Sequence, residues 1–333
     1  MNYFLSKKRI NWLIKGIIIA LLLFTLYKQV LLKENLDSLW QAFLQNQHST
    51  NWPWLLLVFL FMPVNWVFET LKWKILVREF MPITFWRALQ AILLGVTVSM
   101  FTPNRIGEYG GRILMVNAEY NWRAVIATLV GSFSQLLVLL SFGLIGCTFF
   151  VNQYLDFEPF LLRSFLIIGL GLIALLLFGF FNIDLLIPIA RRIPFHEKLK
   201  SYLRHLLVLQ HYSSRILGGA LIFSVLRYVV YTLQYYFILK FFGIQVSLLN
   251  ALAGISTIFL IQTSVPLPPL MGILARGEIA LFIWSFFGAN EISILAATFG
   301  LFIINLSIPA LLGVVVIVKI NVLKSLGYEN END

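Results

Sequence analysis

Three ionisable side chains, Arg105, Glu108 and Arg112, stand close together within an otherwise hydrophobic region. Glu108 and Arg112 are four residues apart, so they would share one face of a short helix. A charge in the middle of a bilayer costs about 2.5–3.5 kcal/mol on insertion scales, so these groups must pair with one another or contact water. One hypothesis is an ion-pair cluster that holds the segment together. The other is an arginine that binds an anionic headgroup, because its planar guanidinium donates two parallel hydrogen bonds to phosphate.

A second charged pair, Arg276 and Glu278, occurs late in the sequence. These residues are two apart and would not face each other on one helix. Pairing between distant segments, such as Arg105 or Arg112 with Glu278, is therefore an alternative. The five charged residues together form the predicted binding site for the substrate.

Polar side chains also interrupt the apolar segments that we expect to span the membrane. Gln135 and Asn305 are predicted to form hydrogen bonds between helices or to line a cavity. Glu69, with Lys72 and Lys74, lies near the end of a predicted span. We interpret these three as side chains that extend to the membrane interface.

Proline and glycine residues interrupt two apolar segments that are too short to cross a bilayer. The 14 residues 88–101 would reach about 21 Å as a helix, against a hydrocarbon core of roughly 30 Å. The segment 248–265 ends in a similar way. Irregular backbone at this depth requires cover from protein or water. The residues expected to break the helices are Pro103, Gly107, Pro266, Pro268 and Gly277.

The composition indicates an all-α polytopic membrane protein. Of the 333 residues, 59% are hydrophobic and 12% are charged, and the mean hydropathy is +0.86. These values exclude an ordinary soluble enzyme. We predict one integral membrane domain over residues 1–333. Six full spans are expected at 12–32, 52–77, 124–151, 161–181, 216–240 and 292–318.

The distribution of basic residues predicts how the short segments lie in the membrane. The segment 184–215 is rich in lysine and arginine and should be a cytoplasmic amphipathic linker. It lands in the cytoplasm only if 88–101 enters the membrane and returns, rather than crossing. We therefore predict two re-entrant hairpins, with return helices near 112–123 and 277–288. Three full crossings lie between them, so they should enter from opposite faces, and both termini should be cytoplasmic.

The two halves of the sequence resemble each other in a colinear series of weak matches. Repeat 1 would cover about 52–151 and repeat 2 about 216–318. A duplicated unit of reversed orientation is the architecture of many secondary transporters, whose binding site lies where the broken helices meet. The matched positions include Trp73 with Tyr235, Pro103 with Pro266, Thr128 with Thr298, Gln135 with Asn305 and Gly143 with Gly313.

Several other functions are disfavoured by the sequence. The formal charge of +10 arises from loops that would face anionic lipid, so no nucleic-acid partner is expected. One cysteine and scattered histidines predict no metal site and no cofactor. A phosphate-binding loop for ATP is not found near Gly110 and Gly111. With no nucleophile–base arrangement visible, we do not expect an enzyme.

The segment Thr102-Pro103-x-Arg105-x-Gly107-Glu108, followed by Arg112, resembles the transmembrane region of lysylphosphatidylglycerol synthases. Stand-alone members of that family are flippase-like membrane proteins. The likeness extends over about residues 10–320. The stretch Gly131-Ser132-Phe133-Ser134-Gln135 stands where the family commonly has a charged Glu-Arg pair. The soluble acyltransferase-like domain of the synthases is not matched, so lysine transfer to lipid is not expected.

The resemblance implies a multi-pass protein of the bacterial inner membrane that moves an anionic lipid headgroup between leaflets. Two alternatives stay open. The cargo could instead be a sugar linked to a polyprenyl phosphate. Alternatively, the protein could be a non-transporting partner that positions a lipid-modifying synthase or a glycosyltransferase.

Overall fold

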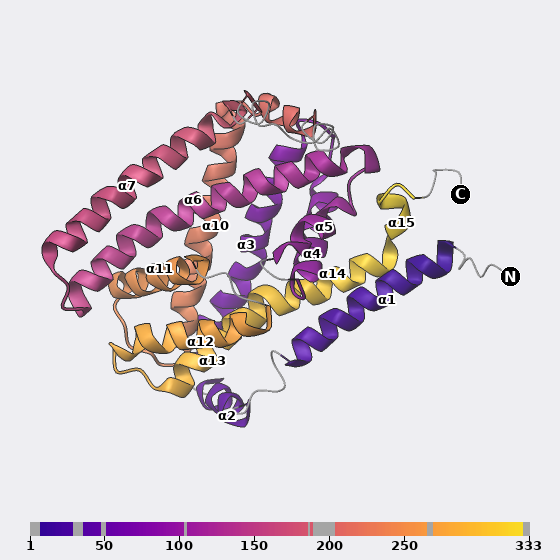
Figure 1. The fold of residues 1–333 in the computed structure, drawn as a ribbon. Coiled ribbons are helices and arrows are strands. Elements are labelled where there is room, and N and C mark those ends of the chain that lie inside the picture. Colours follow the sequence, from indigo (N-terminus) through magenta and orange to yellow (C-terminus); the bar gives the residue numbers. More distant parts are fainter. Residues whose placement is uncertain are drawn as a thin grey trace.

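The part of the chain that the computed structural model describes is mostly helical, and no strand occurs there. This confirms the predicted all-α class. Figure 1 shows two steep central helices crossed by longer and shorter helices on either side, with both chain ends on the same side of the molecule. The structure describes residues 7–28, 36–47, 51–102, 105–185, 187–188, 204–264 and 269–328.

Six helical stretches are long and apolar enough to cross a membrane, and they match the six predicted spans. The last of them is continuous through α13 (Glu291–Phe302), the π-helical turn η6 (Ile303–Ser307) and α14 (Ile308–Lys319). The others are α1 (Lys7–Leu26), α3 (Trp52–Val77), α6 (Asn121–Tyr154), α7 (Pro159–Phe181) and α10 (Ser214–Phe241).

Two shorter apolar helices, α4 (Phe85–Ser99) and α11 (Leu248–Ser264), stand where the short segments were predicted. Each is followed by a return helix, α5 (Gly107–Ile113) or α12 (Pro269–Ser285). Figure 1 shows α4 and α5 together on one side of the molecule and α11 and α12 together on the other. The predicted breakers Pro103, Pro266 and Pro268 lie outside the described residues.

The predicted start of each return helix was wrong. Helix α5 begins at Gly107 rather than near residue 112. Helix α12 begins at Pro269 and continues through Gly277, so Gly277 does not break a helix. Proline is well tolerated at a first helical position, where its missing N–H needs no partner. Gly277 instead permits close packing, since a Cβ atom there would lie 3.1 Å from Leu295 Cδ2 on α13.

Glycines bring α4 and α5 into close contact. A Cβ atom on Gly107 would lie 2.5 Å from Val98 O, and one on Gly111 would lie 2.4 Å from Leu94 O. Real Cβ atoms do not approach a carbonyl oxygen so closely, so only glycine fits at these positions. The Gly107 N–H also donates to Thr102 Oγ1 at 2.8 Å, which joins the two arms of the turn. Arg105, within that turn, has a left-handed backbone with φ of 59°.

Helices α3 and α10 pack against each other along their lengths and form the centre of the molecule. Around them, α4 contacts α14, and α11 contacts α6. In the predicted repeat, α4 corresponds to α11, and α6 corresponds to the helix formed by α13 and α14, so these two contacts are equivalent. The hydrogen bonds follow the same correspondence: Trp73 Nε1 donates to Thr128 Oγ1 at 2.9 Å, and the Tyr235 and Thr298 hydroxyls lie 3.3 Å apart.

Gly143 and Gly313, which are matched between the two halves, both pack closely against a neighbouring helix. A Cβ atom on Gly143 would lie 3.0 Å from Leu260 Cβ, and one on Gly313 would lie 2.0 Å from Thr97 Oγ1. Leu260 and Thr97 are themselves 163 residues apart, the offset that relates Pro103 to Pro266. Equivalent contacts of this kind support a duplicated unit. The opposite orientation of the two units, and the re-entrant path of each hairpin, stay predictions.

The first helix, α1, lies against the last two helices of the described chain. Lys15 Nζ on α1 donates to Val318 O at 2.9 Å, and Asn11 Oδ1 accepts from the Val322 N–H at 2.9 Å. Most of the predicted linker 184–215 lies outside the described residues. The longest described element within it is a 3-10 helix, η5 (Arg204–His211), whose Val208 packs in the main hydrophobic core. The remaining short helices are α2 (Leu36–Gln47), η3 (Ala118–Tyr120), η4 (Ile183–Leu185) and α15 (Val322–Ser325).

Replacing Gly111 with alanine should destabilise the protein, because the added methyl group would collide with the backbone of α4. Overpacking of this kind usually costs about 1–3 kcal/mol. Thermal unfolding of the detergent-purified protein can be followed with a thiol-reactive dye, since Cys147 is the only cysteine and is half-buried.

The matched control is Gly110→Ala on the same helix, where a Cβ atom would meet nothing within 4 Å. This change should leave the unfolding temperature unchanged or raise it, because alanine favours a helix by about 1 kcal/mol over glycine. An equal decrease in unfolding temperature in Gly111→Ala and Gly110→Ala would contradict the close packing of α4 on α5.

Candidate functional site

A buried carboxylate on α3 joins three cations from three different helices. Glu69 Oε2 lies 2.8 Å from Lys72 Nζ and 2.6 Å from Arg227 Nη1 on α10. Glu69 Oε1 lies 2.7 Å from Arg112 Nη2 on α5. The exposed fractions of Glu69, Lys72 and Arg112 are 3%, 1% and 2%, so bulk water does not reach these charges.

The first predicted site extends this network toward the surface. Arg112 also pairs with Glu108, and Glu108 Oε2 lies 3.6 Å from Arg105 Nη2. The side chain of Arg105 is 48% exposed, against 15% for Glu108. The structure therefore brings all three residues of the first motif together. We call the following six residues the ionic cluster: Glu69, Lys72, Arg105, Glu108, Arg112 and Arg227.

The ionic cluster carries more positive than negative charge. Its four cations are opposed by two carboxylates, which leaves a formal charge of +2. Burying charge in a medium of low dielectric constant is costly unless the charges are balanced. The excess therefore favours the binding of an anion next to the cluster.

Arg112 has one donor that the protein leaves unused. Within the described part of the chain, its buried Nε atom has no hydrogen-bond partner. The guanidinium group also lies over the Trp73 ring at 5.9 Å, a cation–π contact that fixes its plane. A buried donor without an acceptor costs about 1–3 kcal/mol. An acceptor oxygen from a ligand or from water would relieve that cost.

Arg227 is the functional residue that the sequence reasoning missed. It lies near the middle of α10, and it is the only charged residue between Arg215 and Lys240. An arginine at the centre of a predicted span costs so much free energy to insert that it indicates a functional site. The sequence therefore contained a signal that could have identified Arg227. Its Nε atom donates to Asn65 Oδ1 at 3.1 Å.

Asn65, in the first half of the protein, connects two residues of the second half, Arg227 and Asn305. Asn65 Nδ2 donates to Asn305 Oδ1 at 3.3 Å, and Asn305 lies in the π-helical turn η6. Asn65 is near the middle of α3, as Arg227 is in α10. The two central helices are thus joined by polar contacts close to their midpoints. Asn305, a predicted cavity residue, is itself buried with an exposed fraction of 2%.

The other predicted cavity residue, Gln135, borders the ionic cluster. Its Oε1 atom accepts from Lys72 Nζ at 3.4 Å, and its Nε2 atom donates to Ser224 O at 3.5 Å. Gln135 therefore links α6 to α3 and α10, as an interhelical hydrogen bond was predicted to do.

The interpretation of Glu69 and Lys72 as interfacial side chains was wrong. Both lie within the last three turns of α3, but α4, α6 and α10 pack against α3, and Arg112 reaches Glu69 from α5. Their charges therefore turn toward other charged groups rather than toward water. The number of residues between a side chain and the end of its span does not show whether neighbouring helices bury that side chain.

The second predicted pair, Arg276 and Glu278, does not join the ionic cluster by an ion pair within the described residues. Glu278 is exposed on α12, so the predicted pairing of Arg105 or Arg112 with Glu278 is not formed. Arg276 is partly buried and lies 5.9 Å from the Phe302 ring. It is near enough to Arg105 for their positive charges to repel.

The described residues contain no group of three or more histidine, cysteine, aspartate or glutamate side chains that could hold a metal ion. The chemistry available at the site is the binding of an anion by guanidinium and ammonium groups.

A protein-family model described as lysylphosphatidylglycerol synthase TM region matches residues 12–313. The matched range contains the whole ionic cluster together with α4, α5, α11 and α12. No curated protein and no solved structure matches the chain. The family match agrees with the resemblance based on the motif around Arg105.

Replacing Glu69 with glutamine should destabilise the protein more than replacing Arg227 with glutamine. The first change leaves three buried cations with only Glu108 to oppose them, whereas after the second Glu69 keeps Lys72 and Arg112. Breaking a buried ion pair costs about 3–5 kcal/mol, so the Glu69→Gln loss should lie in that range. Thermal unfolding with the thiol-reactive dye measures both.

The control is Glu278→Gln, which removes the same charge from an exposed position. It should unfold at the wild-type temperature. If Glu69→Gln were as stable as Glu278→Gln, Glu69 would not be the carboxylate that holds the cluster together.

Proposed function

This chain belongs to the lysylphosphatidylglycerol synthase transmembrane-region family, and we propose that it moves the headgroup of an anionic phospholipid between membrane leaflets. Membership of this family supports a membrane protein with a lipid-related role. The observation that carries the finer proposal is the ionic cluster, which has two more positive than negative charges, extends from the half-exposed Arg105 into the bundle and contains an unused Arg112 donor.

The exposure of the cations falls from 48% at Arg105 to 2% at Arg112, which gives the headgroup a path from the surface inward. Arg105 is half-exposed and would meet the phosphate first. Glu108 is shared between Arg105 and Arg112, so a phosphate that pairs with Arg105 competes with Glu108 for the deeper arginine. The Arg112 Nε–H would then donate to a phosphate oxygen. In this scheme Glu108 positions the arginines and is displaced, rather than binding the ligand itself.

Glu69 would hold the deep end of the path in place while Glu108 exchanges partners. It retains Lys72 and Arg227, and it connects the first hairpin to both central helices. Arg276 would bind the headgroup at the outer hairpin, where its charge and that of Arg105 act on each other. The acyl chains would remain in lipid while the headgroup passes between the hairpins.

The proposal includes the predicted topology. The hairpin α4–α5 would open toward the cytoplasm and α11–α12 toward the outer face of a bacterial inner membrane, with both termini cytoplasmic. Alternate opening of two related hairpins around a fixed site is the usual scheme for transporters built from inverted repeats. The equivalent contacts of Trp73 with Thr128 and of Tyr235 with Thr298 support such a repeat.

A reconstituted liposome assay tests the transport function. Phosphatidylglycerol with a fluorescent acyl chain is placed in both leaflets, and dithionite then bleaches the accessible outer leaflet. The wild-type protein should make nearly all of the label accessible. Arg105→Gln should slow this exchange by about tenfold or more, because a charge-assisted hydrogen bond contributes about 1.5–3 kcal/mol.

Arg163→Gln is the matched control, since Arg163 is an exposed arginine on α7 and has no ion pair within the described residues. It should exchange lipid at the wild-type rate. Exchange by Arg105→Gln at the wild-type rate would contradict the proposed path. No protein-dependent exchange in the wild type would favour the non-transporting alternative. Competition by a polyprenyl phosphate, but not by unlabelled phosphatidylglycerol, would favour the sugar-carrier alternative.

A further inference from the structure

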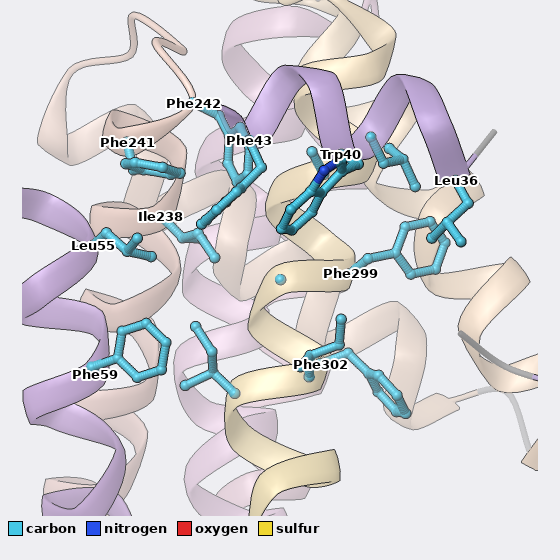
Figure 2. Close-up of a pocket in the computed structure, with 15 residues that line it drawn as sticks. Leu36, Trp40, Phe43, Leu55, Phe59, Ile238, Phe241, Phe242, Phe299 and Phe302 are labelled. Carbon is cyan, nitrogen blue, oxygen red and sulfur yellow. The ribbon is translucent and has the colours of Figure 1, made fainter. Parts of the chain in front are cut away.

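An apolar pocket of about 280 Å³ lies apart from the ionic cluster, between α2, α3, α10 and the helix formed by α13 and η6. Figure 2 shows Leu55, Phe59, Ile238 and Phe241 on one side of it and Phe299 and Phe302 on the other. All fifteen residues that line it are apolar, including a glycine, and seven of them are aromatic: six phenylalanines and Trp40. Nothing in the proposed headgroup path uses this pocket.

Helix α2 covers one end of the pocket. Trp40 and Phe43 lie over it in Figure 2, and their rings stack at a centroid distance of 5.4 Å. Phe43 is anchored in turn on Phe241 at 5.8 Å. Trp40 is 58% exposed, so its indole ring forms an outer rim rather than part of the core. Tryptophan is enriched at the membrane interface, and this places α2 where a lipid chain would enter.

The π-helical turn η6 connects the pocket to the polar centre. Pro309 has no N–H to give to the carbonyl group of Asn305, which accounts for the irregular helix just before it. Ile303 and Ile304 line the pocket, and the next residue, Asn305, bonds to Asn65. The wall of the apolar pocket and the Asn305–Asn65 hydrogen bond, which leads to Arg227 of the ionic cluster, therefore involve neighbouring residues of a single turn.

A cation without a carboxylate partner lies beside the same wall. Phe302 contributes to the pocket, and its ring contacts the guanidinium group of Arg276 at 5.9 Å. No carboxylate within the described residues pairs with Arg276, and the charge of Arg105, which also acts on it, is positive. An apolar pocket next to an unpaired cation is suited to bind an anionic amphiphile, whose chain would fill the pocket while its anionic group pairs with the cation.

The size of the pocket selects among apolar occupants. A helix from a partner protein has a diameter of about 10–12 Å and a pitch of 5.4 Å, so not even one turn would fit in this volume. Apolar cavities of this kind also stay free of water. A flexible hydrocarbon chain fits a narrow space of this kind, and lipid supplies such chains around every spanning helix.

We propose that this pocket holds one hydrocarbon chain of an anionic phospholipid whose headgroup lies toward Arg276. The inference rests on the proposed function, which it deepens by giving the cargo a defined chain site beneath α2. The chain site would keep the lipid engaged at the outer hairpin while its headgroup exchanges between Arg276 and the ionic cluster.

Photocrosslinking of the full-length protein in nanodiscs tests the chain site. The probes are phosphatidylglycerol and phosphatidylcholine that carry the same diazirine acyl chain. Peptides from α2 and α13 should be labelled, and phosphatidylglycerol should label them about fivefold more than phosphatidylcholine, as one cation attracts an anionic lipid by about that factor. Arg276→Gln should bring this ratio close to one without abolishing labelling by either probe.

A pocket-filling variant supplies the second measurement. Gly300 lines the pocket, and a Cβ atom there would lie 2.9 Å from Ile238 Cδ1, the far end of a flexible side chain. Gly300→Leu should reduce labelling of the pocket peptides by about tenfold, because it takes the space of several methylene groups. Gly171→Leu is the control: Gly171 is exposed on α7, with nothing within 4 Å of its Cβ position.

The liposome exchange assay on the same variants separates this inference from the proposed function. Strong labelling of the pocket in a protein that does not exchange lipid would support the chain site and contradict the transport function. Exchange of lipid without labelling of α2 or α13 would overturn the chain site alone. Equal labelling in Gly300→Leu and Gly171→Leu, both eluting from size-exclusion chromatography as the wild type does, would also overturn it.

Discussion

The structure depends on the electrostatic balance around Glu69. This carboxylate is buried among Lys72, Arg112 and Arg227, three cations that come from α3, α5 and α10. None of them could remain charged in an apolar bundle without a partner. The central helices and the first hairpin must therefore keep their positions for the charges to be satisfied. With Glu108 as the only other carboxylate, the balance stays positive, which makes the site suited to an anion.

The packing of the first hairpin is what allows the balance to form. Gly107 and Gly111 let α5 lie directly against the backbone of α4, and this brings Arg112 within reach of Glu69. A longer side chain at either glycine would move the guanidinium group away. In the second hairpin, Arg276 on α12 has no carboxylate partner within the described residues, and its guanidinium group lies against Phe302, which lines the apolar pocket. The two hairpins thus differ in charge balance, although matched residues such as Trp73 and Tyr235 make equivalent contacts.

The sequence predicts the fold of this protein better than its site. Hydropathy alone defines the six spans, because a helix that crosses a bilayer must be apolar over its length. The spacing of Arg105, Glu108 and Arg112 predicted their contacts, since these are local. The burial of Glu69 depends on helices distant in sequence and could not be predicted from its position near a span end. Arg227 was recognisable as an isolated charge in a span, but its partner was not.

The central claim is that the positive excess of the ionic cluster selects an anionic lipid. Native mass spectrometry of the purified protein, with equal amounts of phosphatidylglycerol and phosphatidylcholine of identical chains, measures this selection. Gln135 accepts from Lys72, so Gln135→Glu adds a carboxylate to the cluster without a change in size. The account predicts that the wild type prefers phosphatidylglycerol and that Gln135→Glu lowers this preference by about fivefold. No preference in the wild type, or an unchanged preference in the variant, would contradict it.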